Sequence, residues 1–199
     1  ILNKKENLRI LDVGCGTGKY ARLLASDAAS YTGLDLSASA LKLARSACRP
    51  CANVSFINAS ADSIPCPDNS FDLVFACWVL GTIASEEKRF CAVRDCLRVL
   101  KPGGRVLLIE NDVGGDFEKL RGRYPDTGPT IRYNEWLERA CGLKRLEHFD
   151  SYFNFPSLQL ARRVFKEIWG SEVSSRLHSG VLSHRIVIFE RSSSGGLVF

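Results

Sequence analysis

The chain has 199 residues, 45% of them hydrophobic and 25% charged, and its formal net charge is +5 at pH 7. This composition is that of one folded globular domain and excludes a fibrous or disordered chain. Because we find no signal peptide and no run of about 20 apolar residues, we expect a cytoplasmic protein without a membrane span.

The positive charge raises the question of a nucleic-acid partner. The densest basic stretches, 119–123 and 162–166, are interrupted by apolar or small residues, as on solvated helix faces. We therefore do not expect nucleic-acid binding.

The eight cysteines are interpreted as reduced thiols, because a chain of this size needs no disulfide framework. Cys48 and Cys51 in "CRPC" have the spacing of a zinc or redox pair. No second pair at zinc spacing accompanies them, so we interpret them as ordinary thiols beside a turn and expect no metal.

The first predicted strand is Leu8–Val13, an apolar run that ends at a glycine cluster. A helix over Lys19–Asp27 follows, so the cluster joins a strand to a helix. A second strand is predicted over Ser30–Leu36. The next helix is expected over Ser37–Cys48, with Ser37 as its N-cap.

The alternation continues with strands at Asn53–Asn58 and Phe71–Trp78 and a helix over Ser85–Leu100. "KPGG" at Lys101–Gly104 is expected to stop that helix, since proline cannot continue it and glycine supplies a positive φ. A fifth strand is expected at Arg105–Glu110. Strands that alternate with crossover helices predict a parallel sheet covered on both faces.

Beyond Asn111 the pattern is looser, and a long polar connection is expected up to Thr130. The elements predicted after it are a helix over 134–141, a strand around 144–151, a helix over 158–169 and a last strand over 184–191.

We predict one domain over 1–191 and a flexible tail over Ser192–Phe199, "SSSGGLVF". The chain contains no Met and begins at Ile1, so we expect that an N-terminal segment is missing.

"LDVGCGTGKY", Leu11–Tyr20, spaces its glycines as G-x-G-x-G. A dinucleotide-binding loop has G-x-G-x-x-G, and a P-loop ends in G-K-[ST], whereas Lys19 is followed by Tyr20. Neither phosphate signature is met, although a glycine loop before a helix still lets a ligand approach the main chain.

The same stretch resembles the first motif of class I S-adenosylmethionine-dependent methyltransferases. The resemblance continues through "GLDLS", "IPCPDNSFDLVFACWVL" and "RVLKPGGRVLLIE", in the family's order over 8–110. Within this family the sequence resembles the small Rossmann-like enzymes of the type 11-like group. The resemblance implies a three-layer α/β/α sandwich around a mostly parallel seven-stranded sheet with an antiparallel last strand.

The resemblance also implies an activity: in-line transfer of a methyl group from S-adenosylmethionine to a small-molecule acceptor, which leaves S-adenosylhomocysteine. The sulfonium is already activated, so the protein's main task is to align the acceptor and exclude water.

Several site roles are implied by the resemblance. Asp12 would lie near the ammonium of the donor, Gly14–Gly18 would allow close approach of its amino acid end, and Asp35 would accept from both ribose hydroxyls. The predicted cofactor-binding set is Asp12, Gly14, Cys15, Gly16, Gly18, Tyr20, Asp35, Leu36, Ser60, Ala61, Asp62 and Cys77.

The adenine contact departs from the family's pattern. Relatives usually place an Asp five residues before the Pro of an "LP" dipeptide, where this chain has Ser60. Ser60, the main chain at Ala61 and a shifted Asp62 are the alternatives.

The acceptor side carries fewer signals. Methyltransferases that act on exocyclic base amines and glutamine amides carry a [DNS]-P-P-[YFW] turn after the fourth strand. This chain has "ACWVL" there, so these acceptors are disfavoured. Cys77–Trp78 supplies no oxygen ligands for magnesium. Trp78 either lines the transfer pocket or belongs to the core.

No residue is identified as a general base. His148, His178 and His184 are candidates by residue type, while Tyr20, Asn111 and Asp112 are better placed by topology to contact the acceptor.

Specificity is expected to lie in the missing N-terminus, in Val113–Thr130 and in Phe153–Gly180, whose helix is either a lid or a surface packing helix. The alternatives are a donor-binding module without catalysis and a protein or RNA methyltransferase. A nicotinamide enzyme is disfavoured by the glycine spacing, and the oligomeric state is not predicted.

Overall fold

A seven-stranded sheet in the order β3-β2-β1-β4-β5-β7-β6 lies at the centre of the computed structural model, which describes residues 7–122 and 127–193. β7 is antiparallel to both β5 and β6, and the other neighbours are parallel. The predicted sheet is confirmed. Its strands are β1 (Leu8–Val13), β2 (Ala28–Asp35), β3 (Val54–Asn58), β4 (Phe71–Cys77), β5 (Leu100–Asn111), β6 (Lys144–Asn154) and β7 (Val181–Ser192).

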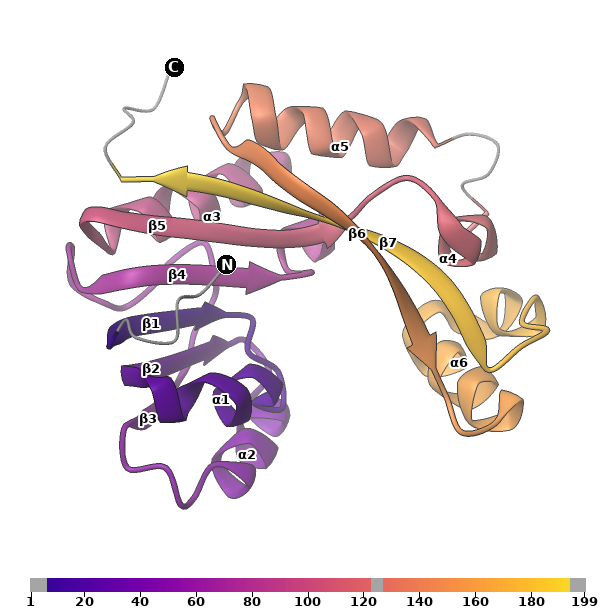
Figure 1. Ribbon diagram of the computed structural model, residues 1–199, viewed down its shortest axis with the longest axis horizontal. Helices are drawn as coiled ribbons and strands as arrows, with labels where there is room; N and C mark the ends of the chain where they lie inside the picture. The colour runs from indigo at the N-terminus through magenta and orange to yellow at the C-terminus, as the bar shows by residue number, and fades with distance from the viewer. Residues whose placement is uncertain (1–6, 123–126, 194–199) are drawn as a thin grey trace.

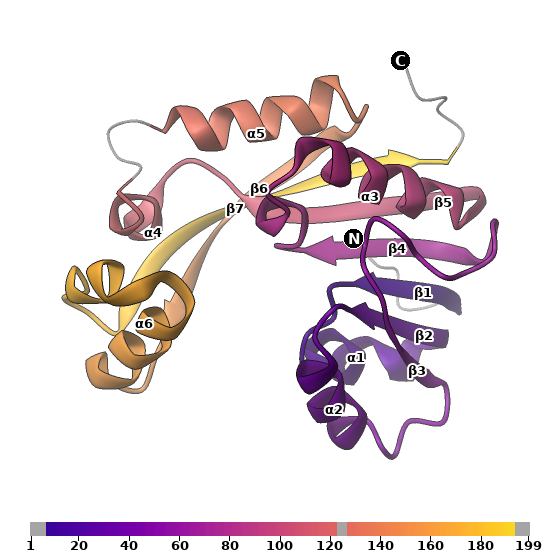
Figure 2. The same cartoon turned by 180° about the vertical axis from the view of Figure 1, so that it is seen from behind.

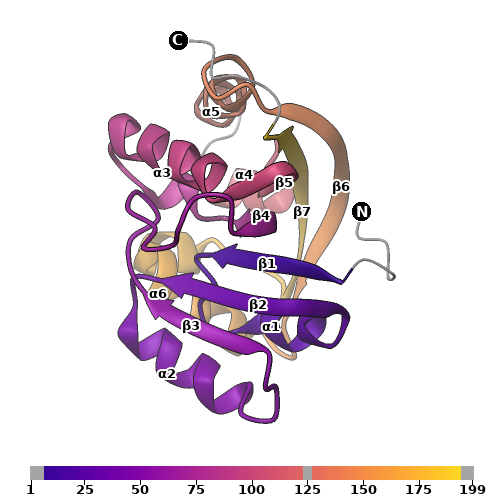
Figure 3. The same cartoon turned by 90° about the vertical axis from the view of Figure 1, so that its left-hand side faces the viewer.

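Helices cover both faces, which confirms the three-layer sandwich. Figure 1 shows α1 in front of the sheet, Figure 2 shows α3 on the opposite face, and in Figure 3 α5 lies beside α3. α4 and α6 lie near the far ends of β6 and β7 (Figure 1). The helices are α1 (Lys19–Leu24), α2 (Ala38–Ala47), α3 (Glu86–Arg98), α4 (Gly115–Leu120), α5 (Gly128–Arg139) and α6 (Leu158–Ser175), with short 3-10 turns η1 (Ala25–Asp27) and η2 (Leu80–Thr82).

Serine side chains cap three of the helices. Ser37 Oγ accepts from the Ala40 N–H at 3.2 Å, as predicted, and Ser85 and Ser157 cap α3 and α6 in the same way. A hydroxyl cap satisfies one of the N–H groups that a helix start leaves without a partner. These serines fix where the three helices begin.

Three hydrophobic clusters divide the molecule. The first joins α3 and α5 to one face of the sheet, and the second joins α1 and α2 to the other. The third, which includes Phe117, Ala161, Phe165 and Leu182, joins α4 and α6 to the start of β7. We call this third cluster the distal cluster. Among the described residues, no helix has the length and apolar character that spanning a bilayer requires.

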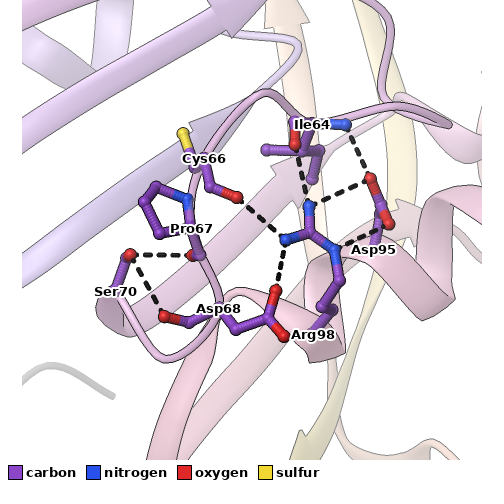
Figure 4. A network of polar contacts seen from close by, with 7 residues as sticks. All are labelled: Ile64, Cys66, Pro67, Asp68, Ser70, Asp95 and Arg98. Carbon is purple, nitrogen blue, oxygen red and sulfur yellow. Dashed lines mark hydrogen bonds and ion pairs between the residues drawn. The ribbon is translucent and has the colours of Figure 1, made fainter.

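Arg98 ties the segment before β4 to α3 (Figure 4). Its guanidinium donates to the carbonyl oxygens of Ile64 and Cys66, both at 2.8 Å, and pairs with Asp68 at 2.7 Å and Asp95 at 3.1 Å. Burial alone raises the pKa of Asp95, but hydrogen bonds from Arg98 and the Ile64 N–H outweigh it and leave that pKa below its usual value. The loop that enters the fourth strand is therefore anchored at its C-terminal half.

The structure differs from the predicted elements in four places. The "KPGG" segment lies inside β5, because α3 already ends at Arg98 and the strand pairs Leu100 with Phe71 before a register shift. The expected polar connection contains α4 and the first turn of α5. α6 continues to Ser175 across a kink at Gly170.

The fourth difference concerns the expected tail. Ser192 ends β7, and the Ser193 N–H donates to the Gly104 carbonyl at 2.9 Å. The remaining tail residues, 194–199, lie outside the described part of the chain.

Candidate functional site

The carboxyl ends of β1, β2 and β4 meet at one edge of the sheet and surround a cavity of about 260 Å³. Open α/β folds bind ligands at this edge. We call it the donor cavity. Six residues of the predicted cofactor-binding set line it: Gly14, Asp35, Leu36, Ser60, Ala61 and Cys77.

The glycine loop is bound tightly to the second strand. The N–H groups of Gly14 and Cys15 both donate to the Leu34 carbonyl, at 2.7 and 3.0 Å. Gly14 has φ 75° and Gly18 has φ 79°, values at which a side chain is strained. A Cβ at Gly14 would also overlap a methyl group of Val79, so the main chain itself forms the wall here.

Asp35 is held from both sides. Its Oδ2 accepts from the Gly16 N–H and its Oδ1 from the Ser37 N–H, each at 2.8 Å. Each carboxylate oxygen can accept a second hydrogen bond. The carboxylate is thus fixed in the wall of the donor cavity with acceptor capacity to spare.

Asp12 lies beneath the loop and is only 1% exposed. The Tyr31 hydroxyl donates to its Oδ2, while Oδ1 is buried and has no partner among the described residues. Burial raises the pKa of Asp12 to about 7, the Tyr31 hydrogen bond lowers it, and the charge of Asp35 raises it further. A buried carboxylate oxygen without a partner keeps hydrogen-bonding capacity that the described residues do not fill.

Tyr20 and Cys77 join the loop helix to the fourth strand, with 3.2 Å between the hydroxyl oxygen and the sulfur. Burial raises the pKa of Cys77 to about 11, and it raises the pKa of Tyr20 well above its usual value. Both groups are therefore neutral at physiological pH. Cys15, 5% exposed, is likewise kept protonated because burial raises its pKa to about 12.

The candidates for the adenine contact are separated by the fold. Ser60 and Ala61 line the donor cavity, but Asp62 does not. The Asn58 amide donates to the carbonyl oxygens of Asp35 and Leu36, both at 2.9 Å, and fixes the end of β3 beside the cavity.

A second cavity, of about 640 Å³, adjoins the first. The two share Trp78, Thr82 and Ile83 as walls. We call the larger one the acceptor cavity. Its other walls come from β5, α3, α4, α5, β6 and α6, and its aromatic residues are Trp78, Phe117, Tyr133, Phe153 and Trp169.

Glu110, at the end of β5, lines the acceptor cavity although only 1% of it is exposed. Its Oε1 accepts from the Tyr133 hydroxyl at 3.0 Å. Burial raises the pKa of Glu110 to about 7, against the lowering effect of hydrogen bonds from Tyr133 and from the Gly81 and Leu80 N–H groups.

The histidine candidates fall in different environments. His148 and His178 are exposed. His184 is 3% exposed, stacks on Phe153 at 4.9 Å, and has its Nε2 2.7 Å from Asn111 Oδ1. Burial and the charge of Arg121 lower the pKa of His184 to about 4, so it is neutral at physiological pH.

Of the two polar candidates at the end of β5, Asn111 lines the acceptor cavity and Asp112 does not. Asp112 instead pairs with Arg145 at 3.2 Å. In the helix α6, Ala161 and Phe165 pack in the distal cluster, as a packing helix would, while Ile168 and Trp169 line the acceptor cavity.

Glu110 and Tyr133 were not predicted. Glu110 ends the apolar run "RVLLIE" at the sheet edge, a position that itself signals a ligand-facing carboxylate. Tyr133 carries no comparable signal, because only the packing of α5 against β5 brings it to Glu110.

Trp78, 36% exposed, has φ 57° at the junction of the two cavities. Such a conformation costs a non-glycine residue about 1–2 kcal/mol, and strain of this kind concentrates at functional sites. The backbone N–H of Trp78 donates to the Ile109 carbonyl at 2.9 Å, which holds the main chain in this conformation. The indole is thus held between the cavities at a cost in stability.

We expect Trp78→Gly to be about 1 kcal/mol more stable than Trp78→Ala, since both remove the indole but only glycine relieves the positive φ. Urea denaturation measures the difference. The control is Ala76→Gly, in the regular part of β4, which we expect to destabilise. Equal stabilities of the two Trp78 variants would refute the strain.

The segment 11–108 matches a family model described as "Methyltransferase domain". The demethylmenaquinone methyltransferase of Tropheryma whipplei is 38% identical over 101 residues, which cover 51% of this chain and 41% of that protein. UbiE, a ubiquinone/menaquinone biosynthesis C-methyltransferase of Shewanella sediminis, is 34% identical over 113 residues, covering 53% and 43%.

The chain spans less than half the length of these curated relatives. Over nearly its whole length the fold is similar to the crystal structure of the YcgJ protein from Bacillus subtilis, with TM-score 0.67, 19% identity, and coverage of 96% of this chain and 93% of that one. The family match spans the glycine loop, Asp35 and the strands that carry the donor cavity. The chain therefore belongs to the class I S-adenosylmethionine-dependent methyltransferases.

Proposed function

We propose that this chain transfers a methyl group from S-adenosylmethionine, bound in the donor cavity, to a small molecule in the acceptor cavity. The observation that carries the proposal is the shared wall of Trp78, Thr82 and Ile83, which places the two cavities side by side. The activities for which these two relatives are named, methyl transfer in menaquinone and ubiquinone biosynthesis, agree with a small-molecule acceptor.

The residues that line the donor cavity, together with Asp12 beneath the glycine loop, fit S-adenosylmethionine. Asp12 Oδ1, buried without a partner, suits the ammonium, and the main chain at Gly14 leaves no room for a side chain. Asp35 retains acceptor capacity for the two ribose hydroxyls. When bound, the donor supplies an activated methyl group on a sulfonium.

For adenine we propose Ser60 and the main chain at Ala61, because both line the cavity and Asp62 does not. Leu36, 74% exposed beside Asp35, offers an apolar surface at the rim.

The chain's own contribution to the reaction is alignment and the exclusion of water. The acceptor cavity has aromatic walls on several elements, and the strained Trp78 stands where the two ligands would meet. Holding the reactants together in a dry site lowers the barrier to displacement at the methyl carbon.

Calorimetric titration with S-adenosylhomocysteine and, in parallel, NADH tests the donor side. We expect S-adenosylhomocysteine to bind and NADH not to bind; NADH binding without S-adenosylhomocysteine binding would overturn the proposal. Release of S-adenosylhomocysteine over an acceptor panel then tests turnover. A donor-binding module without catalysis would bind S-adenosylhomocysteine in the titration but would release none from S-adenosylmethionine with any acceptor.

The affinity for S-adenosylhomocysteine is expected to rise with pH and to level off above about pH 7. An ammonium ligand binds ionised Asp12, whose pKa is about 7 in the free protein, so affinity falls by up to about tenfold per pH unit below it. Asp12→Asn should bind weakly with little pH dependence over this range. A wild-type affinity that is flat between about pH 5.5 and 7 would refute the ammonium contact.

A further inference from the structure

We propose that Glu110 is the proton acceptor for the methyl acceptor, and that the acceptor is a flat aromatic compound whose reacting group is a hydroxyl. The inference rests on the proposed function, since it assigns the acceptor cavity to the second substrate.

The shape and lining of the acceptor cavity point to the ring. Five aromatic side chains line about 640 Å³, joined by Ile83, Pro129 and Ile168. Aromatic walls favour offset or edge-to-face packing against a flat apolar ring. Trp169 and Phe153 line the cavity from α6 and β6, whereas Glu110 lines it from β5.

Glu110 is the acidic side chain at this wall, and its position is fixed. The Tyr133 hydroxyl donates to Oε1 at 3.0 Å, and the Leu80 and Gly81 N–H groups approach from the turn after β4. No cation pairs with it in any of the ion pairs found among the described residues. A buried carboxyl without a cation is ready to exchange a proton near neutral pH.

The other polar groups near Glu110 do not suit this role. Cys77 on β4 and Tyr133 on α5 both have raised pKa values and stay protonated. Arg89 on α3 and Arg121 after α4 are cations, and Asn111 is neutral. His184 on β7 is hydrogen-bonded to the Asn111 side chain through its Nε2 and does not line the cavity.

The step balances without a further reactant. The acceptor oxygen forms a bond to the methyl carbon while the carbon–sulfur bond breaks and its electron pair stays on sulfur; the hydroxyl proton passes to the Glu110 carboxylate. With a pKa of about 7, that carboxylate is ionised in a useful fraction at neutral pH and later returns its proton to solvent.

2-Naphthol is a suitable probe, because it is a flat aromatic alcohol whose fluorescence distinguishes the neutral form from the naphtholate. With protein in excess, we expect the bound probe to gain naphtholate emission as pH rises through about 7. Glu110→Gln should bind the probe within about threefold of wild type yet keep neutral emission throughout. Tyr133→Phe should move the transition up by about one pH unit, since it removes a hydrogen bond to the carboxylate.

Glu118→Gln is the matched control. Glu118 is also buried, at 2% exposed, and accepts from the Thr130 hydroxyl at 2.7 Å, but it does not line the cavity. The 2-naphthol bound to this variant should change its emission at the same pH as in the wild type. Thermal unfolding verifies that each variant is folded, and Tyr133→Phe keeps the test valid if Glu110→Gln does not fold.

Three results would overturn the inference. Naphtholate emission that persists in folded Glu110→Gln, or that does not move in Tyr133→Phe, excludes Glu110 as the proton acceptor; failure of wild type to bind 2-naphthol excludes the aromatic class. Titration of the same samples with S-adenosylhomocysteine tests the proposed function separately, because that binding depends on the donor cavity. Loss of that binding in wild type would overturn the proposed function and leave the naphthol result standing.

Discussion

Replacing Asp35 with alanine is expected to weaken the binding of S-adenosylhomocysteine by about 100-fold or more. Hydrogen bonds to a charged group contribute about 1.5–3 kcal/mol each, and two ribose hydroxyls would lose theirs. The loss is enlarged because the Gly16 and Ser37 N–H groups, each 2.8 Å from the carboxylate, also lose their acceptor. Calorimetric titration gives the affinity directly.

The control for this prediction is Asp62→Ala. Asp62 was an alternative for adenine in the sequence but does not line the donor cavity, so its removal should change the affinity by less than about threefold. If the two aspartate variants bind equally well, the ribose contact at Asp35 is wrong. If Asp62→Ala alone loses binding, the adenine contact must be reassigned to it.

Gly14→Ala is expected to lose about 2–4 kcal/mol of unfolding free energy and most of the donor affinity. The backbone has φ 75°, which costs alanine about 1–2 kcal/mol, and overlap with Val79 adds an overpacking cost of similar size. Relief of that overlap requires the loop or the turn after β4 to move, and both form walls of the donor cavity. Denaturation and calorimetry measure the two effects.

Gly103→Ala separates strain from overlap. Gly103 has φ 81°, but a Cβ there meets nothing within 4 Å, and the residue lies in β5 away from the donor cavity. This variant should lose only the conformational cost and keep its affinity for S-adenosylhomocysteine. Equal losses of stability in the two variants would show that Val79 adjusts freely.

The residues around the donor cavity could be predicted from the sequence because their signals are local. Gly14, Gly16 and Gly18 stand within one turn, and Asp35 follows the next strand, so a short motif contains most of the chemistry. The family match confirms this part of the fold. Ser37 was predicted as a cap for the same reason, since its partner lies three residues away.

The walls of the acceptor cavity could not be predicted in this way, because their residues are far apart in the sequence and meet only through tertiary packing. Trp78, Tyr133 and Trp169 lie on segments far apart in the chain and come together at one cavity. The "KPGG" segment shows a related limit. Its proline and glycines are compatible both with a turn that ends a helix and with an irregular stretch inside a strand. The pairing of Leu100 with Phe71, which lies far away in the sequence, decides in favour of the strand.

The distal cluster keeps part of the wall of the acceptor cavity separate from the donor cavity. Phe117, Phe165 and Leu182 pack largely among α4, α6 and the start of β7, while the donor cavity depends on the other two clusters. Substitutions at Phe153, Ile168 or Trp169 can therefore remodel the acceptor walls without disturbing the glycine loop. Under the proposed function, variation confined to that region would let descendants of one scaffold diverge in the compounds they methylate while keeping the same methyl donor.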